Sequence, residues 1–138
     1  METITVSTNV KAPIARVWEF WTRPEHIVNW CHASDDWHAP HAENDLRDGG
    51  RFVTRMEARD GSAGFDFGGT YTEVTKENRI AYIIDDARNV TVLFDGRDGG
   101  IRVTETFEPE TRNPISLQCA GWQSILDNFR TYAEKESV

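Results

Sequence analysis

The N-terminal part of the chain begins with an alternating pattern and then changes to a helical one. Over residues 3–10 apolar side chains occupy every second position, a period typical of a half-buried strand. Pro13 suits the first turn of a helix, and apolar residues recur at helical spacing after it: Ile14, Val17, Trp18 and Trp21. The string Thr22-Arg23-Pro24-Glu25 then matches a capping box, which predicts a second short helix.

The segment 31–50 has no lasting period. Pro40 and a cluster of Asn, Asp and Gly residues predict a long loop, although residues 42–46 could add a short strand. All four histidines lie between His26 and His41. Loops of this length in a compact domain are mostly functional or disordered, and the tryptophans argue against disorder. We therefore expect Trp30 and Trp37 to anchor a lid.

The second half of the chain predicts strands followed by one long helix. Turn residues separate strands expected at 51–59, 65–74, 79–84, 90–94 and 101–107. Such short connections indicate hairpins in an antiparallel meander. Asn113-Pro114 predicts an N-cap and first turn, and the helix that follows carries one stripe of side chains facing the sheet: Gln118, Trp122, Ile125, Phe129 and Tyr132.

This order of elements predicts an α+β fold in a single domain covering residues 1–138. The apolar face of an open sheet must be covered, and the last helix is the only long element able to lie across it. We expect a curved antiparallel sheet wrapped around a long C-terminal helix, with two short helices after the first strand. Curvature leaves room for a ligand cavity between sheet and helix.

Composition and charge narrow the classes of partner. The 138 residues carry a formal net charge of −8 and no basic run, which argues against nucleic acid and anionic membranes as partners. The first residues lack the basic and apolar regions of a secretory signal, so we expect a cytoplasmic protein. A homodimer is compatible with the sequence, but nothing in it specifies one.

Neither the cysteines nor the histidines form a recognisable metal site. Cys31 and Cys119 have no CxxC spacing and are expected to be free thiols. The histidines match no compact ligand pattern such as HExxH. We expect no metal and no other cofactor.

Several strings, in this order along the chain, resemble the START-like superfamily, also called polyketide cyclase, Bet v 1-like or SRPBCC. They are Ala12-Pro13-Ile14 through Val17-Trp18, residues 22–30, Gly49-Gly50-Arg51-Phe52, Gly69-Thr70-Tyr71-Thr72-Glu73-Val74, and Gly121-Trp122 leading to Leu126. Within it, the chain is similar to the branch that resembles the C-terminal domain of activators of heat-shock protein 90 ATPase. This resemblance implies a helix-grip fold over essentially the whole chain.

The resemblance also bears on partners. Co-chaperones of this type carry a separate N-terminal domain that contacts the chaperone, and 138 residues leave no room for one. Many stand-alone members look like small-molecule binding proteins. A chaperone partner is therefore the least favoured of the alternatives.

Strand alternation predicts which side chains face the cavity. In the strand from residue 51 the less polar face carries Phe52 and Met56, and Gly69 leaves space on the face shared by Phe65, Phe67 and Tyr71. With the helix stripe and the tryptophans of the predicted lid, the expected cavity residues are Trp30, Trp37, His38, Phe52, Met56, Phe65, Phe67, Tyr71, Tyr82, Gln118, Trp122 and Ile125. The alternative is that these residues form a solid core.

Three residues are candidates for acid–base chemistry. Glu105 shares a strand face with Val103 and Phe107, so it enters the concave side of the sheet, is turned to solvent by a bulge, or pairs with a basic side chain of a neighbouring strand. His32 and His38 either contact a ligand at the cavity mouth or remain exposed on the segment anchored by the tryptophans.

These patterns support three functions in decreasing order. The first is a non-enzymatic or weakly enzymatic protein that binds a hydrophobic or aromatic small molecule between sheet and helix. The second is a cyclase-like or hydrolase-like enzyme that uses the same cavity. The third is an interaction module resembling the chaperone ATPase activators.

Overall fold

The computed structural model describes residues 2–137. Within them the elements follow the order β1 (Ile4–Val10), α1 (Ile14–Thr22), α2 (Pro24–Trp30), β2 (Trp37–Asn44), β3 (Arg51–Ala58), β4 (Gly64–Thr75), β5 (Arg79–Ile84), β6 (Asn89–Arg97), β7 (Gly100–Phe107) and α3 (Ile115–Glu136). The strands predicted from residue 51 onward are all present, with ends shifted by a few residues at most. None of the helices in residues 2–137 is both long and apolar enough to cross a membrane.

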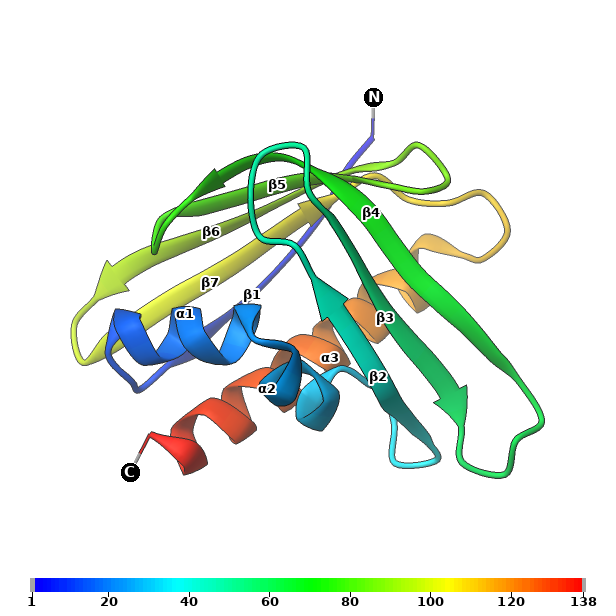
Figure 1. Ribbon diagram of the computed structural model, residues 1–138, viewed down its shortest axis with the longest axis horizontal. Helices are drawn as coiled ribbons and strands as arrows, with labels where there is room; N and C mark the ends of the chain where they lie inside the picture. Colours follow the sequence, from blue (N-terminus) through cyan, green and yellow to red (C-terminus); the bar gives the residue numbers. More distant parts are fainter. Residues whose placement is uncertain (1, 138) are drawn as a thin grey trace.

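The strands form one antiparallel sheet in the order β1-β7-β6-β5-β4-β3-β2. β2 to β7 pair in chain order as a meander, and the last strand, β7, also pairs with the first strand, β1. β1 and β2 therefore form the two edges. The sheet curves over α3, with α1 and α2 on the same side (Figure 1). The predicted α+β helix-grip fold is confirmed.

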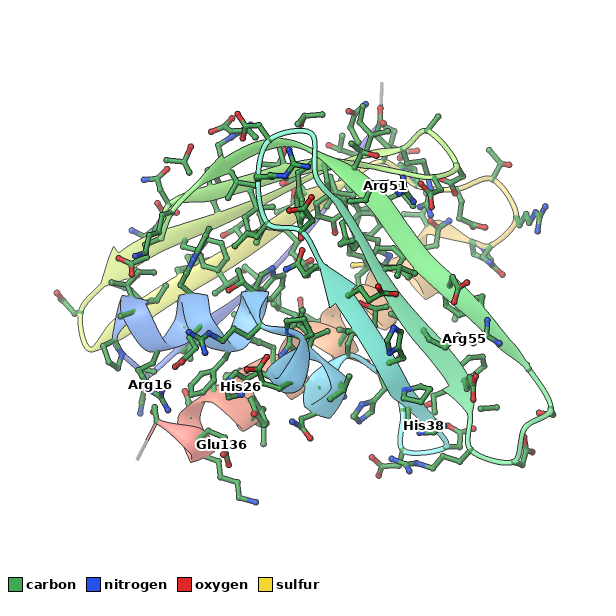
Figure 2. The ribbon with its side chains drawn as sticks, in the orientation of Figure 1. Arg16, His26, His38, Arg51, Arg55 and Glu136 are labelled. Carbon is green, nitrogen blue, oxygen red and sulfur yellow. The ribbon has the colours of Figure 1, made fainter. Side chains whose placement is uncertain are left out.

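Alternation along the strands separates a buried face from a charged one. Met56 on β3 is buried on the concave side, whereas its neighbours Arg55 and Glu57 form an ion pair on the opposite face with 2.9 Å between Nε and Oε2. On that face Arg51 also makes a bidentate pair with Asp85, both distances being 3.0 Å (Figure 2). The concave side therefore contains the core, which α3 completes with fully buried Leu126, Phe129 and Ala133.

The junction between α1 and α2 differs from the predicted capping box. Thr22 ends α1, and its hydroxyl donates to the Trp18 carbonyl at 2.7 Å instead of capping α2. Arg23 is the N-cap residue of α2 and makes no side-chain cap. Because α1 extends through Thr22, the Thr22 hydroxyl bonds to a carbonyl one turn earlier in α1 and is not available to α2. The predicted pair of helices is confirmed, but the capping box is wrong.

The N-terminus of α3 also differs from the prediction. Pro114, and not Asn113, occupies the N-cap position. Gln118 replaces the expected cap from within the helix: its Oε1 accepts from the Glu110 amide at 2.9 Å and its Nε2 donates to the Glu110 and Asn113 carbonyls at 3.0 and 2.8 Å. Gln118 therefore fastens the loop between β7 and α3.

The segment predicted as an irregular lid contains an edge strand. β2 pairs with β3 from Trp37↔Ala58 to Asn44↔Phe52, with an irregularity between His38 and His41. Pro40, which lacks an N–H, lies in that irregularity, where a sheet edge tolerates it. The predicted loop is therefore wrong over residues 37–44, and of the short strand expected at 42–46 only residues 42–44 are correct. Pairing with β3 supplies hydrogen bonds that no local period indicates.

Candidate functional site

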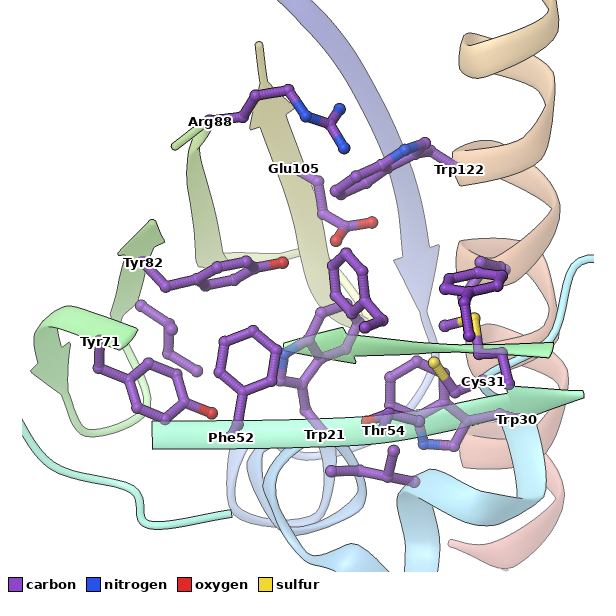
Figure 3. Close-up of a pocket in the computed structure, with 16 residues that line it drawn as sticks. Trp21, Trp30, Cys31, Phe52, Thr54, Tyr71, Tyr82, Arg88, Glu105 and Trp122 are labelled. Carbon is purple, nitrogen blue, oxygen red and sulfur yellow. The ribbon is translucent and has the colours of Figure 1, made fainter. Parts of the chain in front are cut away.

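A cavity of about 270 Å³ lies between the concave face of the sheet and the helices (Figure 3). Strands β3, β4, β5 and β7 supply one wall, and all three helices contribute to the other. The lining residues are Trp21, Ile27, Trp30, Cys31, Phe52, Thr54, Met56, Phe65, Phe67, Tyr71, Ile80, Tyr82, Arg88, Glu105, Trp122 and Ile125.

Most of the cavity residues expected from strand and helix patterns do line this space. Those brought together are Trp30, Phe52, Met56, Phe65, Phe67, Tyr71, Tyr82, Trp122 and Ile125. Their rings meet edge to face as well as tilted, as in the pair Phe52 and Tyr82, whose centroids lie 4.8 Å apart at 77°. Aromatic side chains therefore make up half of the sixteen lining residues.

Gly69 shapes the floor of the cavity. It pairs with Phe52 across β3 and β4, and a Cβ at this position would lie 2.5 Å from the Ile83 carbonyl oxygen and 3.1 Å from the Phe52 ring. Only glycine allows the backbone to approach this closely. The Phe52 ring thus lies over Gly69 rather than being displaced by a side chain there.

Trp122 connects α3 to the sheet at one end of the cavity. Its indole stacks on Phe107 of β7 with centroids 3.8 Å apart and planes at 11°. It also meets Phe67 nearly at right angles, 6.1 Å away. Contact with both β7 and β4 holds the indole across the space between them.

Glu105 introduces a carboxyl into this aromatic wall. The residue is 5 % exposed and lies between Val6 of β1 and Val92 of β6, in registers without a bulge. The sequence left open a bulge that would turn it to solvent, and the regular pairing removes that alternative. Burial raises its pKa to about 8, because water no longer stabilises the charged form.

Other titratable groups face the same space. The Tyr82 hydroxyl points toward the Glu105 carboxyl (Figure 3), and burial together with that carboxyl raises the pKa of Tyr82 well above its ordinary value. Burial and the same carboxyl raise the pKa of the Cys31 thiol to about 12. Tyr71 differs because its hydroxyl donates to Asn44 Oδ1 at 2.5 Å. These groups are protonated at neutral pH.

Arg88 brings a positive charge to the cavity from the turn between β5 and β6. Its Nε donates to both carboxylate oxygens of Asp86, at 3.0 and 2.9 Å, and its Nη1 to the Glu108 carbonyl at 3.1 Å. Its guanidinium points toward the Glu105 and Trp122 side of the space (Figure 3). Asp86 and Glu108 hold the arginine in place at this end of the cavity.

Some lining residues were missed in the sequence. Thr54 and Ile80 lie on faces already predicted to point inward, so alternation was sufficient to find them. Trp21 and Ile27 belong to the apolar faces of the short helices. Cys31 and Arg88 lie outside any periodic pattern, and no sequence signal indicated them.

Three of the residues predicted to line the cavity lie outside its lining. Trp37 packs beside the cavity against Phe65, with ring centroids 6.0 Å apart. His38 lies on the edge strand β2, with its Nε2 3.9 Å from Glu57 (Figure 2). The Gln118 side-chain amide makes its hydrogen bonds to backbone groups of the loop before α3 and does not reach the cavity. Pairing of β2 at the sheet edge carries Trp37 and His38 away from the position expected for a lid.

His32 is also separate from the cavity. Its Nδ1 is buried and has no hydrogen-bond partner among residues 2–137, and burial followed by the charge of Arg59 lowers its pKa. Its backbone carbonyl accepts from Asn128 of α3 at 2.6 Å. His32 therefore links the end of α2 to α3. Within residues 2–137, no three His, Cys, Asp or Glu side chains are grouped so that they could hold a metal ion.

Comparisons with known proteins agree with this architecture. A family model described as Activator of Hsp90 ATPase homolog 1-like protein matches residues 11–134. The solution structure of the AHSA1-like protein from Aeromonas hydrophila is 44% identical with a TM-score of 0.92, covering 98% of this chain and 94% of that chain.

Further solved structures extend the likeness. A structure from Cytophaga hutchinsonii is 46% identical with a TM-score of 0.83, covering 97% of this chain and 93% of that chain. One from Nitrosomonas europaea shares the fold at 21% identity with a TM-score of 0.84, covering 97% and 95% of the two chains. A search of curated proteins found no match.

Proposed function

The chain belongs to the family of Activator of Hsp90 ATPase homolog 1-like proteins, and from that premise we propose that this member binds a hydrophobic, aromatic small molecule in its cavity. The observation that carries the proposal is a space of about 270 Å³ in which half of the lining residues are aromatic and half of the others are aliphatic. Apolar walls favour the transfer of a ring out of water, and edge-to-face contacts orient it.

The cavity volume limits the size of the ligand. An apolar cavity of about 150 Å³ accepts one benzene ring. The space here is larger, so a compound of about one or two rings fits it. Phe65, which is 48 % exposed although it lines the cavity, supports entry beside the start of β4.

The test is a pair of tryptophan substitutions on the same helix. Ile125→Trp places a large ring inside the cavity, whereas Ala120→Trp places the same ring on the exposed face of α3. We expect naphthalene, indole and related neutral compounds to raise the melting temperature of the wild type and of Ala120→Trp, because ligands bound to the folded state stabilise it. Ile125→Trp should lose that response.

Circular dichroism of both variants is the control for folding. A folded Ile125→Trp that is stabilised by the compounds as strongly as the wild type would contradict binding in this cavity. Absence of stabilisation in the wild type across the panel would contradict the proposed function as a whole.

An acid–base enzyme is a second candidate, favoured by the Glu105 carboxyl in the cavity wall. A carboxyl with a pKa of about 8 can donate a proton at neutral pH. Hydrolysis of 1-naphthyl acetate to 1-naphthol and acetic acid tests it by fluorescence. Turnover above background that is lost in Glu105→Gln would support an enzyme. Binding without turnover would contradict the enzyme and leave small-molecule binding as the proposed function.

A further inference from the structure

Three polar side chains in the cavity, Thr54, Tyr82 and Glu105, make no side-chain hydrogen bond within residues 2–137, and the last two point toward one another (Figure 3). The Glu105 carboxyl and the Tyr82 hydroxyl both line the space, and neither makes a hydrogen bond to another group in residues 2–137. Both residues are less than a tenth exposed, at 5 % and 8 %. Buried polar groups are normally paired, and leaving one unpaired costs about 1 to 3 kcal/mol. The cavity therefore contains a polar position in a lining that is mostly aromatic and aliphatic.

We infer that the ligand carries a neutral hydrogen-bond-accepting oxygen, such as a ketone, ester or amide carbonyl, which accepts from the Glu105 carboxyl and the Tyr82 hydroxyl. The inference rests on the proposed function, since it specifies the ligand of the same cavity. The aromatic walls hold the hydrocarbon part, and the two O–H groups orient the oxygen.

The charges around Glu105 favour a neutral acceptor over a cation. Arg88 is the cationic residue of the lining and points toward the same end of the cavity (Figure 3). A positively charged ligand placed beside Glu105 would be repelled by this guanidinium. A purely hydrocarbon ligand would leave the carboxyl and the hydroxyl unpaired and displace any water that serves them.

Protonation links the affinity for such a ligand to pH. The titratable and charged groups that face Glu105 are Cys31 at the end of α2, Tyr71 on β4, Tyr82 on β5 and Arg88 in the following turn. Burial raises the pKa values of the thiol and both phenols, and the guanidinium keeps its charge. Glu105, with a pKa of about 8, is then the cavity group that loses its proton between pH 6.5 and 9.

Three naphthalenes of similar shape provide the probes. They are 1-acetylnaphthalene, which has a carbonyl acceptor, 1-isopropylnaphthalene, which has none, and 1-(1-naphthyl)ethylamine, which is a cation. At pH 6.5 we expect the acetyl compound to bind the wild type about tenfold more tightly than the isopropyl compound, measured by calorimetry. Its affinity should fall about tenfold between pH 6.5 and 9, because ionised Glu105 no longer donates.

Variants assign the effect to the two side chains. Glu105→Gln keeps a donor that does not titrate, so binding of the acetyl compound should persist and become independent of pH. Glu105→Leu should bind the acetyl and isopropyl compounds equally. Tyr82→Phe removes the second donor alone and should reduce the preference for the acetyl compound, which keeps the inference testable if Glu105→Leu does not fold.

The possible results separate the inference from the proposed function. Equal binding of the acetyl and isopropyl compounds at all pH values would overturn the inference and leave the aromatic cavity intact. Tightest binding of the amine, increasing with pH, would also overturn it. Binding of none of the three would overturn the proposed function itself, and the inference with it.

Discussion

At the scale of single residues, Glu105 is the unusual side chain of this protein. It alternates with Val103 and Phe107, both fully buried, and so faces the interior from β7, the strand next to the edge strand β1. Its carboxyl has no hydrogen-bond partner in residues 2–137, so burial destabilises the charged form and hence the fold at neutral pH. The position has an energetic cost that a ligand contact would offset.

The pH dependence of stability tests this burial directly. Burial raises the folded-state pKa of Glu105 from an ordinary 4.5 to about 8. Between these values the folded protein binds a proton that the unfolded chain has released, so the free energy of unfolding falls as pH rises, by up to roughly 1.4 kcal/mol per unit. We expect Glu105→Gln to remove this slope, and its advantage over the wild type to grow from pH 5 to 8 in urea titrations.

An exposed carboxyl serves as the control for that experiment. Glu2 lies at the surface ahead of β1, and Glu2→Gln should leave the slope unchanged. A wild-type slope that persists in Glu105→Gln would show that other groups cause it.

At the scale of elements, a proline determines how α1 and α2 are joined. Pro24 lies four residues after Phe20 and has no N–H, so it cannot donate to the Phe20 carbonyl as the next turn of a helix would. The Trp30 indole donates to that carbonyl instead, at 3.0 Å. One side chain thus completes the end of α1 and fixes the orientation of α2.

Trp30→Phe tests this connection. The phenyl ring retains most of the packing but leaves the Phe20 carbonyl without its donor, which should lower the free energy of unfolding by about 1 to 3 kcal/mol in urea titrations. Trp37→Phe is the matched control, because the half-buried Trp37 packs on Phe65 and its indole donates to no group in residues 2–137. Equal losses in the two variants would contradict a specific role of the indole hydrogen bond.

Strand β2 was missed because its side chains carry no alternating pattern. Alternation over residues 101–107 is complete within one strand and was sufficient to predict β7. β2 has no such pattern, because buried and exposed positions do not alternate across its proline and register shift, and its stability comes from pairing with β3. A pattern of side chains cannot reveal a strand that is defined by its backbone partner.

At the scale of the whole molecule, the order of strands predicts an uneven resistance to local opening. β7 lies between β1 and β6, and Val103 and Phe107 are fully buried. β2 is an edge strand with an irregularity around Pro40. We expect amide hydrogen exchange, followed by nuclear magnetic resonance, to be slowest in β7 and much faster in β2. Equal protection of the two strands would contradict this order.

The extent to which the cavity could be predicted follows from the same geometry. Phe52, Met56 and Tyr82 were assigned inward because the side-chain period of a strand is fixed by its backbone, and Trp122 and Ile125 because a helix repeats every 3.6 residues. These local rules also sufficed to predict strands β3 to β7 and the gripping helix, whereas they left open whether Glu105 enters the concave side or turns to solvent. They need no knowledge of distant residues.

Contacts between distant segments decided the remainder. Pairing of β2 with β3 removed Trp37 and His38 from the cavity, and the turn after β5 brought Arg88 to it. The depth of the cavity, and the lack of a hydrogen-bond partner for the Glu105 carboxyl within residues 2–137, also depend on how far the sheet curls around α3. Those outcomes belong to the tertiary structure, because they arise from the packing of side chains that are far apart in sequence and carry no shared local pattern.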